Sequence, residues 1–354
     1  MAGDSNKRLL SLDAYRGFIM FTLISHGLGF SVLKNYPGWE WLARQVDHVD
    51  WSGCVFWDLI QPAFTFMVGM AMPLALERRR AEGATFGQLI KHVAWRAFAL
   101  IALSNILSNW GSAQPKLQLI NVLSQIAFGY LLCFFILQLR FVWQVAACVA
   151  MLALHWGLFV AFPGAEGPFA KTVNIGAAID LAVLGYNYSG GYTTLNFLGN
   201  AVTILFGCWC GLLLMRPLSS QRKLNILTAA AVAAWLAGLA LEPLNPMVKR
   251  LWTASFALYS AGWAIAILAL LYWLIEIRNI RRWTFPFLIL GMNSIFIYSF
   301  SQVLYGWLDR GLAVFSTRFA FLGPLGAIPQ ALLVFSAMWY LCYWLYQRKI
   351  FFKL

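Results

Sequence analysis

The feature that most constrains this chain is a succession of apolar runs, each long enough to cross a lipid bilayer and nearly free of charged residues. A transmembrane helix needs about 20 apolar residues, because the hydrocarbon layer is about 30 Å thick and each residue adds about 1.5 Å. In lipid every backbone polar group must be satisfied internally, and continuous rather than alternating runs favour helices over a barrel. We therefore predict an all-α, polytopic membrane protein with about ten spans, near residues 17–35, 54–76, 93–110, 118–139, 141–161, 194–215, 225–241, 252–275, 284–305 and 325–347.

Composition indicates that the membrane part is the whole chain rather than one anchor on a soluble body. Hydrophobic residues make up 61% of the sequence and charged residues 11%, against roughly 25% charged residues in soluble domains. The connections are short, the longest being residues 163–193, and no linker or internal repeat divides the sequence. We expect one transmembrane domain over residues 1–354. The first apolar run lacks a small-residue cleavage site, so we expect no cleavable signal peptide.

The formal charge of +13 reports membrane topology. With the N-terminus inside, the predicted cytoplasmic segments hold sixteen Lys and Arg residues, and the opposite segments hold eight, among them Lys171, Lys249 and Arg250. Basic residues collect in the cytoplasmic loops of membrane proteins. The count therefore predicts that both termini are cytoplasmic, and it removes the reason to expect a nucleic-acid partner.

The six cysteines are Cys54, Cys133, Cys148, Cys208, Cys210 and Cys342. Most lie inside apolar runs, and the pair Cys208 and Cys210 does not have the two-residue spacing of a redox motif. Free cysteine usually behaves as a small buried hydrophobic residue. We interpret all six in that way and predict no metal site.

Four stripes of polar side chains interrupt the predicted spans. A polar group in the bilayer core is expensive and is a functional hypothesis by default. The simpler interpretation is hydrogen bonding between helices, worth about 0.6 kcal/mol per contact. Four stripes together favour a polar cavity, which either a transporter or an embedded enzyme would need. The stripes are Asn105 and Asn109; Gln118, Asn121 and Gln125; Asn196, Asn200 and Thr203; and Asn293, Ser294, Tyr298, Ser301 and Gln302.

The segment from His48 to Pro62 is the most informative in the chain. In the predicted topology it begins on the extracytoplasmic side and enters the second span, so that Asp58 lies about one turn inside the membrane. A carboxylate there needs a partner, which could be a histidine ring nitrogen or a cation such as Arg16. Histidine can take a proton or carry an acyl group. Taken alone, His48 is an interfacial residue, as are His92 and His155.

Several ordered motifs resemble heparan-α-glucosaminide N-acetyltransferase and its bacterial relatives, and the resemblance covers nearly the whole chain. We expect the chain to belong to the bacterial branch, which is associated with N-acetylglucosamine use. The motifs are Ser11-Leu12-Asp13-Ala14-Tyr15-Arg16-Gly17, His48-x-x-Trp51-x-Gly53-x4-Asp58-Leu59-Ile60-x-Pro62, Asn174 to Asp180, Leu251-Trp252-Thr253-x-Ser255-Phe256, Gly291-Met292-Asn293-Ser294-Ile295 and Arg348 to Lys353.

The resemblance implies transfer of an acetyl group from cytosolic acetyl-CoA, as co-substrate, to an amino sugar or glycan on the extracytoplasmic side of a bacterial inner membrane. It implies that His48 is catalytic, and we expect Asp58 to support it. The expected partners are a coenzyme A ester, the acceptor and membrane lipid, and a homodimer is left open. We expect the substrate or coenzyme A to contact Asp13, Arg16, His26, Arg96, Trp252, Asn293 and Ser294.

A basic cluster is a candidate site for the phosphates of coenzyme A. Coenzyme A carries phosphates that bind Lys or Arg, and the cluster lies at Arg78, Arg79, Arg80, Lys91 and Arg96. The same cluster is what a cytoplasmic loop would contain in any case.

The alternative function is an amino-sugar transporter of the same fold without acyl transfer, although transporters often show two related halves, which this sequence does not show.

Overall fold

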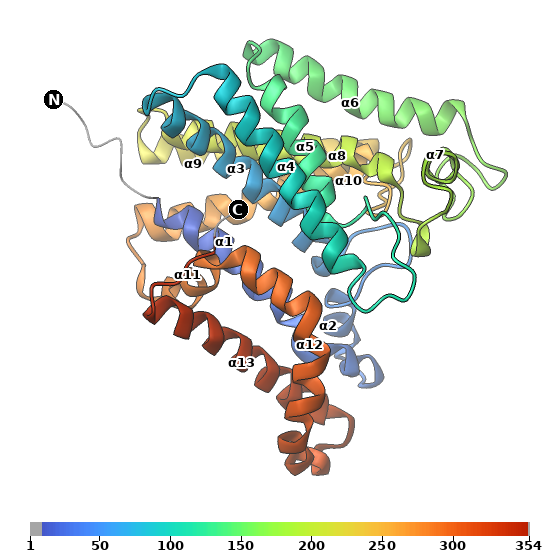
Figure 1. The fold of residues 1–354 in the computed structure, drawn as a ribbon, viewed down its shortest axis with the longest axis vertical. Helices are drawn as coiled ribbons and strands as arrows, with labels where there is room; N and C mark the ends of the chain where they lie inside the picture. The colour runs from blue at the N-terminus through green and yellow to red at the C-terminus, as the bar shows by residue number, and fades with distance from the viewer. Residues whose placement is uncertain (1–8, 353–354) are drawn as a thin grey trace. The chain divides into compact units, whose positions relative to one another are not determined.

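In the computed structural model, which describes residues 9–352, the regular structure is helical, and no β-strand is named among those residues (Figure 1). Seven helices within this range are long and apolar enough to cross a membrane, and two bent pairs raise the number to nine if each pair is one span. The predicted all-helical polytopic fold is confirmed. The predicted fourth span corresponds to a 15-residue helix, α5 (Val122–Ile136), so a count of ten spans stays a prediction, as does the side on which the termini lie.

The chain folds into two compact units, which we describe separately. The first unit comprises residues 1–47, 218–228 and 266–354, and the second comprises residues 48–217 and 229–265. Two helices have residues in both units: α9 (Ser220–Leu241) and α10 (Ala254–Tyr272). The division had no counterpart in the sequence analysis, because no linker separates the units in the sequence.

The second unit is built around two central helices, α3 (Ile60–Ala81) and α8 (Phe197–Met215), which pack along each other. Helices α4 (Phe86–Ser108), α5 and α6 (Phe141–Ala161) pack around them, and Figure 1 shows α3, α4, α5 and α8 side by side. The remaining elements of this unit are shorter: η2 (Phe56–Leu59), α7 (Ile175–Leu184), η3 (Ser189–Gly191) and η4 (Thr194–Asn196).

Glycines let α3 and α8 approach closely. A Cβ added at Gly69 would lie 2.1 Å from the carbonyl oxygen of Ile204, and one added at Gly207 would lie 2.1 Å from that of Phe66. Small residues at helix contacts are typical of membrane proteins, where packing and not the hydrophobic effect holds helices together. This close contact fixes η2, and therefore Asp58, relative to α8.

In the first unit, α1 (Leu10–Ile24) packs on α11 (Phe285–Met292), and α12 (Ser294–Ser316) packs on α13 (Ala327–Gln347). Two of its predicted spans are bent. The first bends by 49° between α1 and η1 (His26–Asn35), and the ninth bends by 69° between α11 and α12, at Asn293. The other elements of this unit are α2 (Glu40–Gln45), η5 (Trp273–Ile277), η6 (Arg282–Thr284) and η7 (Thr317–Gly326).

The polar stripes have different fates. The stripe on α8 is buried, and Asn200 donates to Thr65 of α3 at 3.2 Å, as expected for hydrogen bonding between helices. The stripe predicted at the start of the fourth span is wrong as a helical face, because α5 begins only at Val122 and Gln118 lies in the extended segment before it. Asn121 is the N-cap of α5, where its side chain accepts from the backbone of Leu123.

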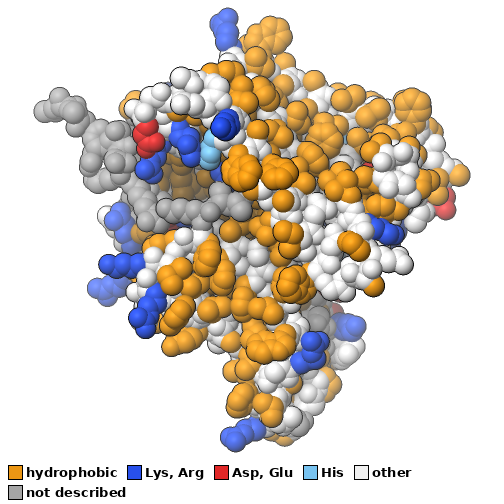
Figure 2. All heavy atoms as spheres, viewed as in Figure 1, with side chains coloured by type: hydrophobic (Ala, Val, Ile, Leu, Met, Phe, Trp, Pro, Cys, Tyr) orange, Lys and Arg blue, Asp and Glu red, His pale blue; other side chains and the backbone are white. Residues whose placement is uncertain are grey.

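The outer helices of the second unit expose apolar side chains, as lipid-facing helices do. Less than a third of α4, α6 and α9 is buried, whereas most of α3 and α8 is buried. Figure 2 shows hydrophobic side chains spread over the face formed by α4, α5 and α6. Large exposed residues of this kind include Trp95, Phe98, Phe141 and Trp143. We conclude that these helices contact the acyl chains of the membrane.

Candidate active site

Three loops of the second unit meet around the segment that begins at His48. The amide of Gly53 donates to the carbonyl of Met247 at 2.8 Å, and the indole of Trp51 donates to the carbonyl of Phe169 at 2.9 Å. These bonds join residues 48–59 to the loop after α6 and to the loop between α9 and α10. The predicted topology places all three loops on the extracytoplasmic side, so their convergence agrees with that topology.

His48, Asp58 and Lys249 form a compact polar group within this cluster of loops. Nδ1 of His48 lies 2.7 Å from Oδ1 of Asp58, and Nζ of Lys249 lies 3.4 Å from the same oxygen. The side chains of Asp58 and Lys249 are 1% and 7% exposed, whereas that of His48 is 41% exposed. A carboxylate and an ammonium are therefore buried beneath an imidazole that solvent can reach.

The backbone also holds the Asp58 carboxylate in place. Its Oδ2 accepts from the amide of Val55 at 3.3 Å and from that of Val49 at 3.4 Å. Asp58 is the third residue of η2, and the Val55 contact satisfies an amide at the start of this helix. Of the two kinds of partner left open for Asp58, the histidine ring is in contact with it, and helix capping explains why a carboxylate is needed at this position.

The cation beside Asp58 is Lys249. Arg16, which the sequence suggested as a cation for this role, instead pairs with Asp13 at 2.8 Å in the first unit. A tight turn after Lys249 holds it in place: Trp252 donates to the carbonyl of Lys249 at 3.0 Å. Trp252 has φ of +53°, a left-handed conformation that a large side chain adopts only when its surroundings enforce it.

The geometry assigns the proton on the His48 ring. An ionised carboxylate only accepts hydrogen bonds and an ammonium only donates them. The 2.7 Å contact to Asp58 therefore requires Nδ1 of His48 to carry a hydrogen. Nζ of Lys249 lies 3.2 Å from Nδ1 because both groups donate to one oxygen. In the neutral ring, Nε2 is then the nitrogen whose lone pair a base or a nucleophile would use.

Burial shifts the pKa of Lys249, a member of this polar group, and that of its neighbour Cys54. Burial lowers the pKa of Lys249, and the carboxylate of Asp58 opposes that shift. Burial raises the pKa of Cys54 to about 12, and the charge of Asp58 acts in the same direction. A thiol with so high a pKa is a poor nucleophile near neutral pH. Cys54 is thus no rival to His48, in line with its interpretation as a small apolar residue.

Polar and aromatic side chains surround His48. Lys171 donates to Asp50 at 2.8 Å, and this contact lowers the pKa of Asp50. Arg250 donates to the carbonyl of Gly190 at 2.6 Å, and its guanidinium lies 5.6 Å from the ring centre of Tyr192. These contacts bring both charge signs and a half-buried aromatic ring to the loops that carry His48.

Of the other predicted site residues, Trp252 and Arg96 also belong to the second unit. Trp252 is 1% exposed, and its indole donates to Thr203 at 3.2 Å, so its described contacts are those of a core residue. Arg96 lies on α4, where it donates to the hydroxyl of Tyr130 at 3.4 Å.

The remaining predicted site residues lie in the first unit. Asp13 and Arg16 form a pair on α1, and His26 stacks on Tyr305 with ring centres 3.7 Å apart. Asn293 donates to the carbonyl of Ile350 and accepts from the amide of Phe352, so both ends of its amide bind the C-terminal segment. Ser294 is the first residue of α12. Substrate contacts for these residues stay predictions.

The described residues contain no group of three or more His, Cys, Asp or Glu side chains arranged to hold a metal ion.

Two histidines that were not predicted as site residues lie on helices of the second unit. His92 is half-buried on α4. His155, expected at an interface, is instead 1% exposed within α6, with its ring 4.8 Å from that of Phe159. His155 is a core residue.

The chain is similar along almost its entire length to two named enzymes. It is 26% identical to human heparan-alpha-glucosaminide N-acetyltransferase, over 98% of this chain and 60% of the human protein. It is 25% identical to the mouse enzyme of the same name, over 99% of this chain and 61% of the mouse protein. The chain therefore resembles the heparan-α-glucosaminide N-acetyltransferases. It spans about three fifths of their length, and no protein-family model matches it.

The resemblance found in the motifs is thereby confirmed, and the structure shows what several of the shared residues do. Asn174 caps α7 by accepting from the amide of Ala177, and Asp180 of α7 accepts from the amide of Thr194 at 2.9 Å. Thr253 accepts from the amide of Val248 at 3.0 Å and closes the turn that holds Lys249. These motif residues shape the loops around His48.

Sequence reasoning missed Lys249, which it counted only as an extracytoplasmic charge. One signal was available: Lys249 lies just before the Leu251-Trp252-Thr253 motif. A lysine beside a shared motif, in a loop predicted on the same side as His48, was a candidate partner for Asp58. The pairs of Lys171 with Asp50 and of Arg250 with Tyr192 gave no sequence signal, because they join loops that are far apart in the chain.

Proposed function

We propose that this protein is a membrane-embedded N-acetyltransferase. It moves the acetyl group of acetyl-CoA to the amino group of an amino sugar or glycan on the extracytoplasmic side. The observation that supports this most directly is the half-exposed His48, whose Nδ1 donates to the buried carboxylate of Asp58, so that Nε2 is the nitrogen that reacts when the ring is neutral. The similarity to two N-acetyltransferases supplies the reaction class.

An amine attacks a thioester only in its neutral form. In direct transfer, Nε2 of His48 takes a proton from the amine as its nitrogen bonds to the acetyl carbon. The carbon–sulfur bond then breaks, and the proton passes from Nε2 to the sulfur of coenzyme A. Asp58 stabilises the imidazolium that forms in between, and Lys249 balances the charge of Asp58.

Covalent transfer uses the same lone pair differently. Nε2 attacks the acetyl carbon, the carbon–sulfur bond breaks, and the acetyl group stays on the ring while coenzyme A leaves. The amine of the sugar then attacks the acetyl-imidazole, loses its proton to solvent and releases the ring. Donor and acceptor could then use His48 in turn from opposite sides of the membrane.

The cellular setting belongs to the same proposal. The donor is cytosolic, so the chain crosses the membrane that separates coenzyme A from the acceptor, which we assign to a bacterial inner membrane. Acceptors related to glucosamine, whose product is an N-acetylglucosamine unit, are the first to test. A polar acceptor of this type is supported by the charged and aromatic side chains on the loops that carry His48, which are Asp50, Lys171, Tyr192 and Arg250.

The test is acetyl transfer by the purified protein reconstituted in liposomes. Radiolabelled acetyl-CoA is supplied on one side and glucosamine or a glucosamine-ended glycan on the other. We expect N-acetylated sugar from the wild type and none from His48→Ala, although that variant still folds and binds acetyl-CoA. Wild-type rates in His48→Ala would remove His48 from the mechanism. Uptake of unmodified sugar without acetylation, together with no binding of acetyl-CoA, would establish a transporter instead.

A trapped acetyl group decides between the two routes. The protein is incubated with labelled acetyl-CoA without acceptor, quenched quickly and digested. Label on the peptide that contains His48 selects covalent transfer, and its absence in a protein that is active in the same preparation selects direct transfer.

A further inference from the structure

An arginine lies inside a membrane-spanning helix of the second unit. Arg96 is on α4, which begins at Phe86, and it falls near the cytoplasmic end of the predicted span 93–110. Charged residues inside a span are costly and usually serve an ion or a substrate. An anionic partner would offset that cost.

The described residues supply no carboxylate to Arg96. One Nη donates to the hydroxyl of Tyr130 at 3.4 Å, and the guanidinium lies 4.9 Å from the centre of that ring. Its Nε is buried without a hydrogen-bond partner. Arginine has five donors in a planar fork that fits carboxylate and phosphate groups. Most of that capacity is unused by the described residues.

A histidine shares a helix face with Arg96, since His92 precedes Arg96 by four residues on α4. The charges of Arg79 of α3 and of Arg96 both act on His92 and on Tyr130 of α5. Like charges that act on the same groups repel each other, and an anion bound between the two arginines would relieve that repulsion.

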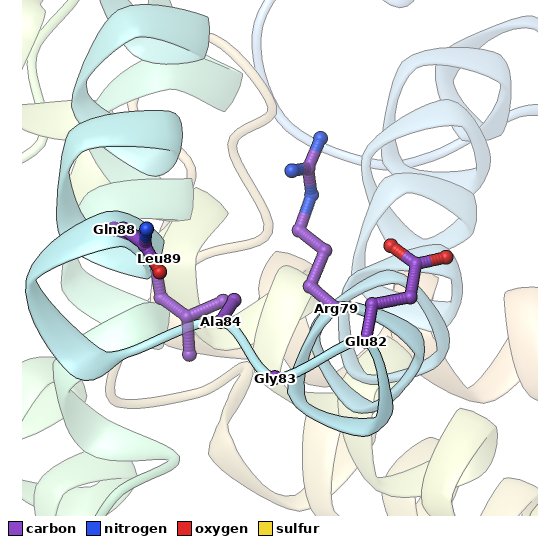
Figure 3. Close-up of a pocket in the computed structure, with 6 residues that line it drawn as sticks. All are labelled: Arg79, Glu82, Gly83, Ala84, Gln88 and Leu89. Carbon is purple, nitrogen blue, oxygen red and sulfur yellow. The ribbon is translucent and has the colours of Figure 1, made fainter.

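Arg79 also lines a pocket of about 420 Å³ at the turn between α3 and α4. In Figure 3, Arg79 and Glu82 project from the end of α3, and Gln88 and Leu89 lie across the turn at the start of α4. The turn passes through Gly83, which has φ of +87°. The only described acid of this pocket, Glu82, is already paired with Arg78 at 3.0 Å.

We propose that Arg79 and Arg96 bind a phosphate group of the coenzyme A ester at the cytoplasmic end of α3 and α4. The inference rests on the proposed function. Guanidinium groups bind phosphate oxygens in pairs of parallel hydrogen bonds, and Arg96, the deeper of the two, aligns the donor for entry into the membrane. The predicted topology places this end opposite to the loops that carry His48, which is where a cytosolic donor would enter.

The experiment compares donors with and without phosphate. Binding of acetyl-CoA and of S-acetyl-pantetheine, which lacks all phosphates, is measured by calorimetry for wild type, Arg79→Gln and Arg96→Gln. Arg80→Gln is the matched control, because Arg80 is exposed, neighbours Arg79 and hydrogen-bonds to Gln138. We expect each of the two site variants to weaken acetyl-CoA at least tenfold, to leave S-acetyl-pantetheine unchanged, and to differ from the control.

The other outcomes separate this site from the proposed function. If the wild type binds and transfers but both site variants bind acetyl-CoA as tightly, only the phosphate site is wrong. Equal weakening of both donors also overturns it, because a phosphate contact cannot act on a phosphate-free ligand. If the wild type neither binds nor transfers, the proposed function fails and takes this inference with it. The binding assay is repeated in nanodiscs with and without phosphatidylglycerol. If the variants lose only a preference for this lipid, the site binds a lipid phosphate and the proposal is overturned.

Discussion

Nζ of Lys249 lies 3.2 Å from Nδ1 of His48, although the two residues are 201 positions apart in the chain. They meet because both donate to Oδ1 of Asp58. A buried carboxylate with one positive partner is a neutral pair, so Lys249 balances the charge of Asp58 while Asp58 orients the His48 ring. The neutral form of that ring is the one that accepts a proton or attacks a thioester.

Loss of the carboxylate should separate orientation from stability. We expect Asp58→Asn to lower transfer by about 100-fold or more, because general-base catalysis contributes about that much and the ring proton is no longer fixed. It should also destabilise the protein by about 3–5 kcal/mol, since it leaves the buried ammonium of Lys249 without its counter-charge. Initial rates and thermal unfolding in the same detergent measure the two effects.

A double variant provides the control for that prediction. Asp58→Asn combined with Lys249→Met removes both charges, so we expect stability to recover substantially while transfer stays low. Recovery of transfer in the double variant would show that Asp58 serves only to neutralise Lys249 and does not orient His48.

Lys249 should set an alkaline limit to activity. Burial lowers its pKa below the ordinary lysine value of 10.5, despite opposition from Asp58. As the pH rises through that lowered pKa, the ammonium loses its charge and the Asp58 carboxylate loses its partner, so activity should fall before pH 10.5. In Lys249→Arg the side chain stays protonated, and the fall should move to higher pH. Rate profiles from pH 6 to 11 test this, and identical alkaline limbs would exclude Lys249 as their source.

Most of the fold followed from sequence because it depends on local hydrophobicity. Nine of the ten predicted spans correspond to helices or bent pairs that can cross a membrane. The proximity of His48 and Asp58 was also within reach, because the turn at Ser52 and Gly53 and the start of η2 lie between them. Spacing within one short segment constrains geometry strongly.

The parts that sequence reasoning missed depend on contacts between distant segments. Lys249 becomes a partner of Asp58 only because the loop before α10 folds beside η2, and no local pattern predicts this. The break at Asn293 was missed for a related reason: the side-chain amide of Asn293 binds the backbone of residues 350 and 352, a contact between segments that are distant in the chain. An apolar run reveals its length but not where tertiary hydrogen bonds will interrupt it.

The contact between α3 and α8 should tolerate no added methyl group. We expect Gly69→Ala to destabilise the protein by about 1–3 kcal/mol, because the new Cβ would lie 2.1 Å from the carbonyl oxygen of Ile204 and the helices must separate. Gly157→Ala is the matched control, since nothing lies within 4 Å of a Cβ there. Thermal unfolding compares the two. Equal melting temperatures would mean that α3 and α8 do not pack as closely as described.

Substitution of Asn293 can distinguish a structural role from the substrate role predicted from its motif. Because its amide binds the carbonyl of Ile350 and the amide of Phe352, we expect Asn293→Ala to release the C-terminal segment and to destabilise the protein by about 1–3 kcal/mol. Limited proteolysis should then remove the segment faster than in Gln302→Ala, an exposed change on α12. A variant that keeps wild-type protection but loses acetyl transfer would favour the substrate role.

The predicted topology requires His48 and the C-terminal segment to lie on opposite sides of the membrane. Single cysteines are placed at Glu166, in the loop that contacts Trp51, and at Lys349, in a background where the six native cysteines are replaced. An impermeant thiol reagent added to intact cells should label position 166, and it should label position 349 only after the membrane is opened. Both sites are exposed, so failure to label cannot be ascribed to burial. Labelling of position 349 in intact cells, or of position 166 only after opening, would reverse the orientation and place His48 on the side of the acetyl-CoA supply.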